Sequence, residues 1–215
     1  ETLAEEIRAI HDTVRLDAVA AGLPDDGQPL RTGGSGARAY ADAILTLLTI
    51  ALGKFVNRSC AFNFWDSGHG SIQQPFAQQG FQKSWDFVES IPFCEASGSW
   101  LKAVEYPLKV IRELYTDVKP GRVICQPVSR ARDAGGPFIV ITDPPYYDQI
   151  GYADLSDFFY IWERKALRDI YPELFATVLT PKEEELAAVP HRYDGDRQRA
   201  ERAFVEGLQA AFREL

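Results

Sequence analysis

Apolar residues in the first hundred positions recur every three or four residues, which is the spacing of a helix that buries one face. This pattern predicts three helices, over residues 1–21, 37–56 and 76–90. Ser99 is a good N-cap for a fourth helix, which we expect to run to about Tyr115 and to bend at Pro107. Residues 57–75 are rich in aromatic side chains and irregular in pattern. Residues 1–98 are therefore predicted to form a mostly helical region.

The pattern changes in the second half of the chain. Two short apolar runs, Val123–Cys125 and Phe138–Ile141, are typical of interior strands in a parallel sheet. Helical patterns follow over Tyr152–Leu167, from Thr180 as an N-cap with Pro181 in the first turn, and from about Asp196 to Leu215. Residues 99–215 are therefore predicted to form an α/β region with few strands and an incomplete sheet.

Composition narrows the class of protein. The chain has 215 residues, of which 46% are hydrophobic and 25% charged, as in ordinary globular proteins. It contains no long uninterrupted apolar stretch, so we expect no membrane span. Its cysteines are expected to be reduced, as in a cytoplasm. Three scattered cysteines, with no Cys-x-x-Cys pair, indicate neither a zinc site nor a disulfide framework. The formal net charge of −8 argues against broad nonspecific binding of nucleic acid.

Several features indicate an internal segment of a larger protein. The chain begins at Glu1, has no methionine and ends inside a predicted helix, although replaced or omitted methionines would give the same composition. The run Gly33–Gly36 precedes a helix but follows no strand, so we expect a flexible loop rather than a phosphate-binding loop. His69 has no partner at metal-ligand spacing, and two arginine-rich stretches, at 164–168 and 192–202, are expected to be solvated helix faces.

The second apolar run ends in Asp143-Pro144-Pro145-Tyr146, a rigid turn with one carboxylate and one aromatic ring. In open α/β sheets, ligands bind where strands end. An exocyclic amine on a heteroaromatic ring is a poor nucleophile, and acceptors for its two N–H groups stabilise the charge that develops when it attacks a methyl group. Asp143 and the carbonyl of Pro144, fixed by the two prolines, are candidate acceptors. Tyr146 is a candidate stacking surface for an extruded base.

The turn resembles the catalytic motif of S-adenosylmethionine-dependent amino-methyltransferases of nucleic acids. The longer string TDPPYYDQIGYADLSDFFYIWERKAL is similar to the large adenine-specific DNA methylases that carry an added zinc ribbon. Looser likeness extends over most of the chain from about Ala37, through AYADAILTLLTIALGKFVNRSCAFNFW, SWDFVESIPF, YPELF, LTPKEEELAAVP and FVEGLQAAF. The resemblance implies a fragment of a Rossmann-like methyltransferase that acts on adenine in DNA, in restriction–modification or phage defence.

The chain also departs from this family. It has no Phe-x-Gly-x-Gly-type loop, which cradles the methionine part of S-adenosylmethionine and which the family places far upstream, and it lacks the zinc-ribbon cysteines. Gln126 stands where an acidic residue often meets the adenine of the cofactor, so Gln126 and Asp143 are the candidate cofactor contacts. The resemblance thus implies two partners, DNA and the remaining methyltransferase half upstream and downstream.

Alternatives stay open at the level of sequence. Tyr147 and Asp148 either shape the substrate pocket or pack and cap the turn, and Tyr152 is a candidate for the same cleft. Asp154 is most simply a surface acid favoured by the helix dipole. In the family that the chain resembles, this form of the motif tends to act on the exocyclic amine of adenine. The same chemistry would serve cytosine, an RNA base or a protein glutamine. A non-catalytic helical interaction module that retained the motif is the alternative from another class.

Overall fold

A computed structural model describes residues 2–76, 87–96, 98–114, 119, 121, 123–128, 139–148 and 150–214. The chain divides into two compact units. The first comprises Glu1–Tyr115 and Asp157–Leu179, and the second comprises Thr116–Ser156 and Thr180–Leu215. The boundary predicted between residues 98 and 99 from composition stays a prediction, although the helix expected to open the second region belongs to the first unit.

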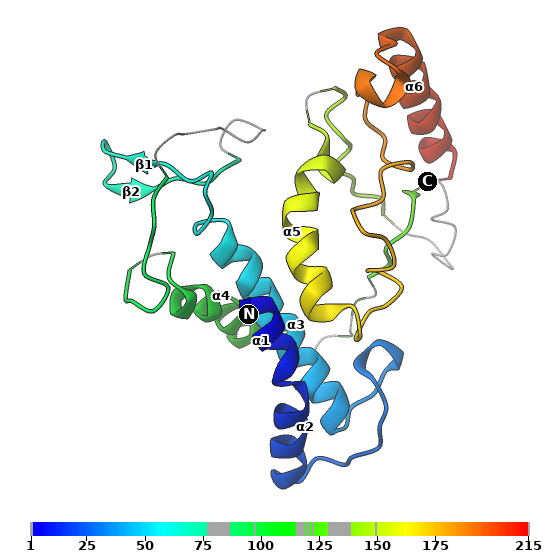
Figure 1. Cartoon of the computed structure of the whole chain (residues 1–215). Coiled ribbons are helices and arrows are strands. Elements are labelled where there is room, and N and C mark those ends of the chain that lie inside the picture. Colours follow the sequence, from blue (N-terminus) through cyan, green and yellow to red (C-terminus); the bar gives the residue numbers. More distant parts are fainter. Residues whose placement is uncertain are drawn as a thin grey trace. The chain divides into compact units, whose positions relative to one another are not determined.

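The first unit is built around the long helix α3 (Ala37–Val56). Three helices pack against it: α1 (Leu3–Ala9), α2 (His11–Ala20) and α4 (Trp100–Glu113), of which α4 crosses α3 steeply (Figure 1). Helix α5 (Tyr152–Leu167) contributes its residues from Asp157 onward. Its Tyr160 and Leu167 join Leu45 and Leu52 of α3 in one buried cluster, so the apolar face predicted for each helix is the face that is buried.

Helix α3 carries one buried acid inside this apolar environment. Asp42 is 2% exposed, its Oδ1 lies 2.8 Å from Nε2 of His11, and its Oδ2 accepts a hydrogen bond from the backbone N–H of Leu30 at 3.0 Å. These contacts join α2, the 3₁₀ turn η1 (Leu30–Thr32) and α3. By length and composition α3 could also cross a membrane, but an apolar helix in a protein core has the same composition. The predicted absence of a membrane span stays a prediction.

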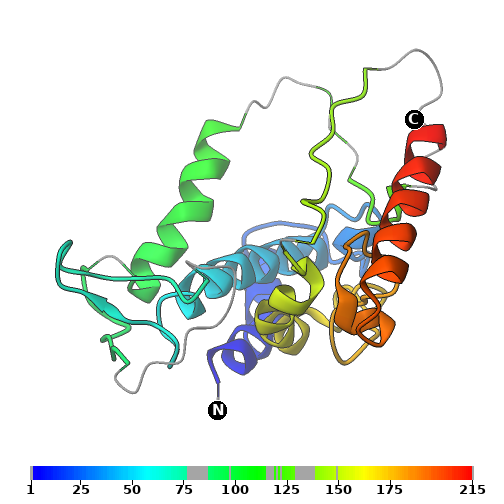
Figure 2. The same cartoon turned by 90° about the horizontal axis from the view of Figure 1, so that it is seen from above.

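Among the described residues, the only sheet is a short antiparallel hairpin, β1 (Trp65–Asp66) and β2 (Ser71–Ile72), visible beside α3 and α4 in Figure 2. It lies in the stretch predicted to be irregular. Buried Asn63 anchors it, because its amide donates to the carbonyls of Asn57 and Gln73 at 3.0 and 2.7 Å. His69 is a loop residue of this hairpin, with Nδ1 2.7 Å from Asp66 Oδ2.

The second unit contains α6 (Arg197–Glu214), the 3₁₀ turn η3 (Pro190–Tyr193) and irregular segments around the Asp-Pro-Pro-Tyr motif. Asp196 caps α6, since its Oδ1 accepts from the N–H of Arg199 at 3.0 Å. Gly207 lies in the middle of α6, and a Cβ there would collide with the side chain of Leu186. The glycine therefore lets the segment before η3 approach the helix closely.

The best-defined helical predictions are confirmed. Helices α3 and α5 have the predicted bounds, and Ser99 caps α4, where its Oγ accepts from Lys102 N at 3.3 Å and Pro107 lies inside the helix. The helix predicted over 1–21 is divided into α1 and α2 at Ile10. Most of the helix predicted over 76–90 lies outside the described residues, and its end, 87–90, is irregular.

Three predictions about the second half are wrong. Val123–Cys125 forms no strand. In the second run, residues 139–141 form no strand either, and Phe138 lies outside the described residues. A strand needs a partner, and these runs have none among the described residues: Val123 is 99% exposed and Ile141 92%. The predicted helix from Thr180 is irregular as well. Helix nevertheless far exceeds strand in the described ranges, as expected, and the Rossmann-like fold class itself stays a prediction.

Candidate functional site

The Asp-Pro-Pro-Tyr motif lies in an irregular stretch of the second unit that ends in a turn. Asp143, Pro144 and Tyr146 are exposed, whereas Pro145 is half-buried. The next residue, Tyr147, has a φ of 55°, in the left-handed region that side chains other than glycine rarely adopt. That conformation costs roughly 1–2 kcal/mol for an ordinary L-residue, so surrounding contacts must hold it.

Three contacts hold Tyr147 in this conformation. Its carbonyl accepts a hydrogen bond from the N–H of Ala188 at 3.0 Å. Its ring packs edge-on against Phe204 of α6, with centroids 5.3 Å apart. A hydrogen bond to Glu201, one turn earlier on α6, raises the pKa of the Tyr147 phenol, which therefore stays protonated. These are the contacts of a packing residue, and the alternative role of Tyr147 in binding a base stays a prediction.

Asp148 completes the turn beside the first residue of α6. Its Oδ2 lies 3.8 Å from the guanidinium of Arg197, and both side chains are more than one-third exposed. An exposed pair at this distance contributes little to stability. The carboxylate of Asp148 is thus accessible, and its predicted part in substrate binding stays a prediction.

The motif forms one wall of a cavity of about 310 Å³. Thr142, Asp143, Pro144 and Pro145 line one side, and Leu186 with the last turns of α6 lines the other. The remaining lining residues are all apolar: Val128, Leu208, Ala211 and Phe212. An apolar slot with a single carboxylate has the composition of a site for a flat, mostly apolar ring that carries hydrogen-bond donors.

Tyr152, the first residue of α5, lies close enough to this wall to be affected by it. Partial burial raises the pKa of its phenol, and the neighbouring phenol of Tyr146 and carboxylates of Asp143 and Glu185 raise it further. The phenol is therefore neutral near neutral pH and can donate a hydrogen bond. This electrostatic proximity supports the prediction that Tyr152 belongs to the same region as the motif.

Arg192 forms the one strongly connected ionic network of the second unit's described residues. Its Nη2 donates to Asp154 Oδ2 at 2.7 Å, and its Nη1 pairs with Glu185. Glu185 also accepts from the N–H of Ala153 at 3.0 Å, at the start of α5. Burial lowers the pKa of the Arg192 guanidinium, but the two carboxylates more than offset this and raise it overall. The network joins the segment after Thr180 to α5.

Sequence reasoning missed this network. The pattern predicts a solvated cluster for Arg192 and a lone surface acid for Asp154, yet they pair with each other, and the Arg192 side chain is only 14% exposed. No local pattern could have indicated the pairing, because the two residues are 38 positions apart. The weak signal was the Pro190 that follows the acidic run, since a proline there ends a helix and frees the acids for other partners.

Gln126 is exposed and is not among the residues that line the cavity, although Val128, two positions later, is. Its predicted contact with a cofactor stays a prediction. Within the ranges that the structure describes, no group of three or more histidine, cysteine, aspartate or glutamate side chains could hold a metal ion.

The residues around the cavity do not fit S-adenosylmethionine by themselves. The amino-acid part of that cofactor carries a carboxylate, and the lining residues include no cation and no glycine-rich backbone that could hold it. The composition of the cavity suits the molecule that receives a transferred group better than it suits a donor such as S-adenosylmethionine. Comparison with family models, with curated proteins and with solved structures finds no match to this chain.

Proposed function

We propose that the chain is the substrate-positioning part of an S-adenosylmethionine-dependent DNA adenine amino-methyltransferase. One observation carries the proposal: Asp143, Pro144 and Pro145 of the motif line a mostly apolar cavity of about 310 Å³, and Asp143 contributes its only carboxylate. The resemblance of the motif and of its flanking sequence to adenine-specific DNA methylases supplies the reaction class. The cofactor site itself is expected outside the described cavity.

In this proposal the chain acts on the amine and leaves the methyl donor to other residues. Asp143 and the carbonyl of Pro144 accept hydrogen bonds from the two N–H groups of the exocyclic amine. As the nitrogen lone pair leaves conjugation with the ring, positive charge develops on the nitrogen, and the two acceptors stabilise it. Tyr146, which is 56% exposed, stacks on the base and fixes its plane. S-adenosylmethionine, when bound to the whole enzyme, supplies the methyl group.

The first test removes the carboxylate. In the full-length protein, Asp143→Ala should reduce the transfer of tritiated methyl groups to unmethylated duplex DNA by 10²–10³-fold, because losing one preorganised acceptor costs about 3–4 kcal/mol in the transition state. Binding of S-adenosylmethionine should change by no more than a few-fold. Glu206→Ala, which removes an exposed carboxylate of α6 outside the cavity, is the matched control and should be fully active.

The same assay separates the competing functions. Transfer by Asp143→Ala at a rate within threefold of the unsubstituted protein would rule out the role of the carboxylate. Transfer to cytosine, RNA or a protein glutamine, but not to adenine, would keep the chemistry and change the substrate. A full-length protein that shows no saturable binding of S-adenosylmethionine would be an interaction module instead.

A further inference from the structure

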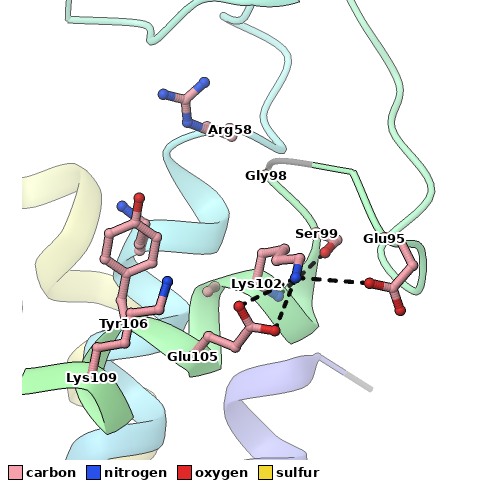
Figure 3. Close-up of a pocket in the computed structure, with 10 residues that line it drawn as sticks. Arg58, Glu95, Gly98, Ser99, Lys102, Glu105, Tyr106 and Lys109 are labelled. Carbon is pink, nitrogen blue, oxygen red and sulfur yellow. Dashed lines mark hydrogen bonds and ion pairs between the residues drawn. The ribbon is translucent and has the colours of Figure 1, made fainter. Parts of the chain in front are cut away.

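A second cavity, of about 420 Å³, lies in the first unit between the end of α3 and the beginning of α4 (Figure 3). Its lining differs from that of the cavity at the proline turn, because it is dominated by charged side chains. Four of these are cations: Lys54, Arg58, Lys102 and Lys109. Two are carboxylates, Glu95 and Glu105. The cavity therefore has a formal surplus of two positive charges in a chain whose net charge is −8.

The fold brings these cations together. Lys54 lies in the last turn of α3, and Arg58 lies in the turn that follows, two residues after the helix ends at Val56. Lys102 and Lys109 are seven residues apart on α4, two helical turns, and share a face. Gly98, with a φ of 94°, lies directly against Arg58, and a Cβ there would be 3.3 Å from Arg58 Cδ. Close packing of α3, the Gly98 turn and α4 thus places four positive charges around one opening.

Both carboxylates are committed to one of the four cations. Lys102 Nζ donates to Glu105 at 3.0 Å and lies 3.8 Å from Glu95, as the dashed lines in Figure 3 show. The hydrogen bond to Glu105 raises the pKa of the Lys102 ammonium. Among the described residues, no carboxylate lies within ion-pairing distance of Lys54, Arg58 or Lys109. The positive surplus is therefore carried by these three side chains.

An aromatic ring holds two of these cations near each other. Lys54 Nζ lies 3.4 Å from the centroid of the Tyr106 ring, and Lys109 Nζ lies 5.7 Å from it. The face of an aromatic ring attracts a cation by about 0.5–1 kcal/mol at an exposed site, which partly offsets the repulsion between the two ammonium groups. Figure 3 shows Tyr106 and Lys109 side by side on α4. A second anchor fixes Arg58, which donates to the carbonyl of Ile72 at 2.9 Å.

We propose that this basic cavity binds phosphate groups of a nucleic-acid backbone. The surplus of two positive charges matches two phosphodiesters, and lysine and arginine side chains are the usual phosphate ligands of DNA-binding proteins. The N-terminus of α4, capped by Ser99 in the cavity wall, adds a partial positive charge. The choice of nucleic acid, rather than a free phosphate compound, as the source of the phosphates rests on the proposed function.

The test compares pairs of substitutions that change the net charge equally. Binding of the 215-residue chain to a short fluorescein-labelled DNA duplex is followed by fluorescence anisotropy over a series of salt concentrations. Lys54→Gln with Lys109→Gln should weaken binding roughly tenfold, and should reduce the slope of log K against log salt by about 1.8, which is 0.9 for each phosphate that is no longer neutralised. Arg112→Gln with Lys119→Gln, two exposed cations outside the cavity, should change neither quantity appreciably.

Two further measurements protect the interpretation. Lys54→Arg with Lys109→Arg keeps both charges and should bind like the unsubstituted chain, and thermal melting shows that each variant is folded. Equal effects of the cavity pair and the control pair, or no salt-dependent binding of the duplex at all, would overturn the proposal. Calorimetric binding of inorganic pyrophosphate that depends on Lys54 and Lys109, without duplex binding, would also overturn it and would assign the cavity to a small phosphate compound.

The outcome is independent of methyl transfer. Duplex binding is measured without S-adenosylmethionine, and Asp143→Ala should leave it unchanged, because Asp143 does not line the basic cavity. If Asp143→Ala retains full methyl transfer while the salt slope still depends on Lys54 and Lys109, the proposed function fails and the phosphate site stands. If Asp143→Ala loses methyl transfer while the salt slope does not depend on Lys54 and Lys109, the phosphate site is wrong and the proposed function stands.

Discussion

Two adjacent tyrosines of the turn have different surroundings, and this difference bears on which of them could stack on a base in the proposed function. The ring of Tyr147 packs against Phe204, and its carbonyl accepts a hydrogen bond from the N–H of Ala188, so Tyr147 packs against α6. Tyr146 is 56% exposed, with a ring that is available for stacking. The sequence motif names both residues, but only the structure distinguishes the packed ring from the accessible one.

Substitution of Tyr146 tests its stacking role. Tyr146→Ala should weaken engagement of the target base by about 1–3 kcal/mol, because stacking of a base on an aromatic ring contributes that much. Tyr146→Phe should be much milder, since stacking needs the ring and not the hydroxyl. The measurement is the affinity of the full-length protein for a duplex with an abasic site or mismatch opposite the target base. A Phe variant as damaging as the Ala variant would show that the hydroxyl, not the ring, is what matters.

The sequence indicates some candidate residues of the site and misses others. Asp143 is a candidate because the feature that suggests its chemistry is local: a carboxylate on a rigid proline turn. Arg192 cannot, because its two carboxylate partners come from distant segments. A motif therefore suggests a candidate group from local sequence, whereas the ionic contacts that hold the surrounding segments depend on how the chain folds back on itself.

Elements with one continuous apolar face were predictable to the residue. The apolar residues of α3 and α5 repeat over four or more turns, and such long patterns leave little choice of bounds. The segment from Thr180 has good helix signals, but its backbone and acids are used elsewhere: Ala188 N donates to Tyr147 and Glu185 pairs with Arg192. Tertiary contacts here outweigh a local preference of a few tenths of a kcal/mol per residue.

The strand predictions failed for a different reason. An apolar run indicates that a segment is suited to burial, but a strand forms only when a neighbour takes up its N–H and C=O groups. Ile139 and Ile141 are about nine-tenths exposed, so nothing in the described chain covers them. The pattern indicates a segment suited to burial, but no described residue packs over these two side chains.

The glycine run before α3 is explained by close packing rather than by phosphate binding. A Cβ on Gly36 would lie 2.5 Å from the carbonyl oxygen of Pro24, which itself accepts from the N–H of Ala37. Gly34 meets the backbone of Gln28 just as closely. The loop therefore folds back against the start of α3, and neither glycine has room for a side chain.

Gly36→Ala should destabilise the first unit by about 1–3 kcal/mol, because a backbone carbonyl cannot move aside as a flexible side chain can. The thermal midpoint should fall by roughly 2–4 °C for each kcal/mol in a chain of this size. Gly121→Ala is the matched control, since no atom lies within 4 Å of the place that its methyl group would take and its φ is ordinary. If the two variants melted at the same temperature, the loop would be loose rather than packed against α3.

At the scale of the whole molecule, two of the cavities in the described part of the chain have opposite character, and each lies within its own unit. One is apolar with a single carboxylate, and the other is lined by four cations. Neither has the combination that S-adenosylmethionine requires, which is a glycine-rich backbone for its amino-acid part together with a slot for its adenine. Neither of these two cavities is therefore a site for S-adenosylmethionine as it stands.

The 215-residue chain is therefore expected to bind S-adenosylmethionine weakly or not at all. The only glycine-rich run, Gly33–Gly36, follows no strand, and Gly34 and Gly36 are packed against backbone, so it cannot approach a ligand as a cofactor loop does. Calorimetric titration of the chain with S-adenosylmethionine should give no saturable heat, whereas the full-length protein should bind stoichiometrically. Tight binding by the chain alone would contradict this prediction and would show that a cofactor site lies within these residues.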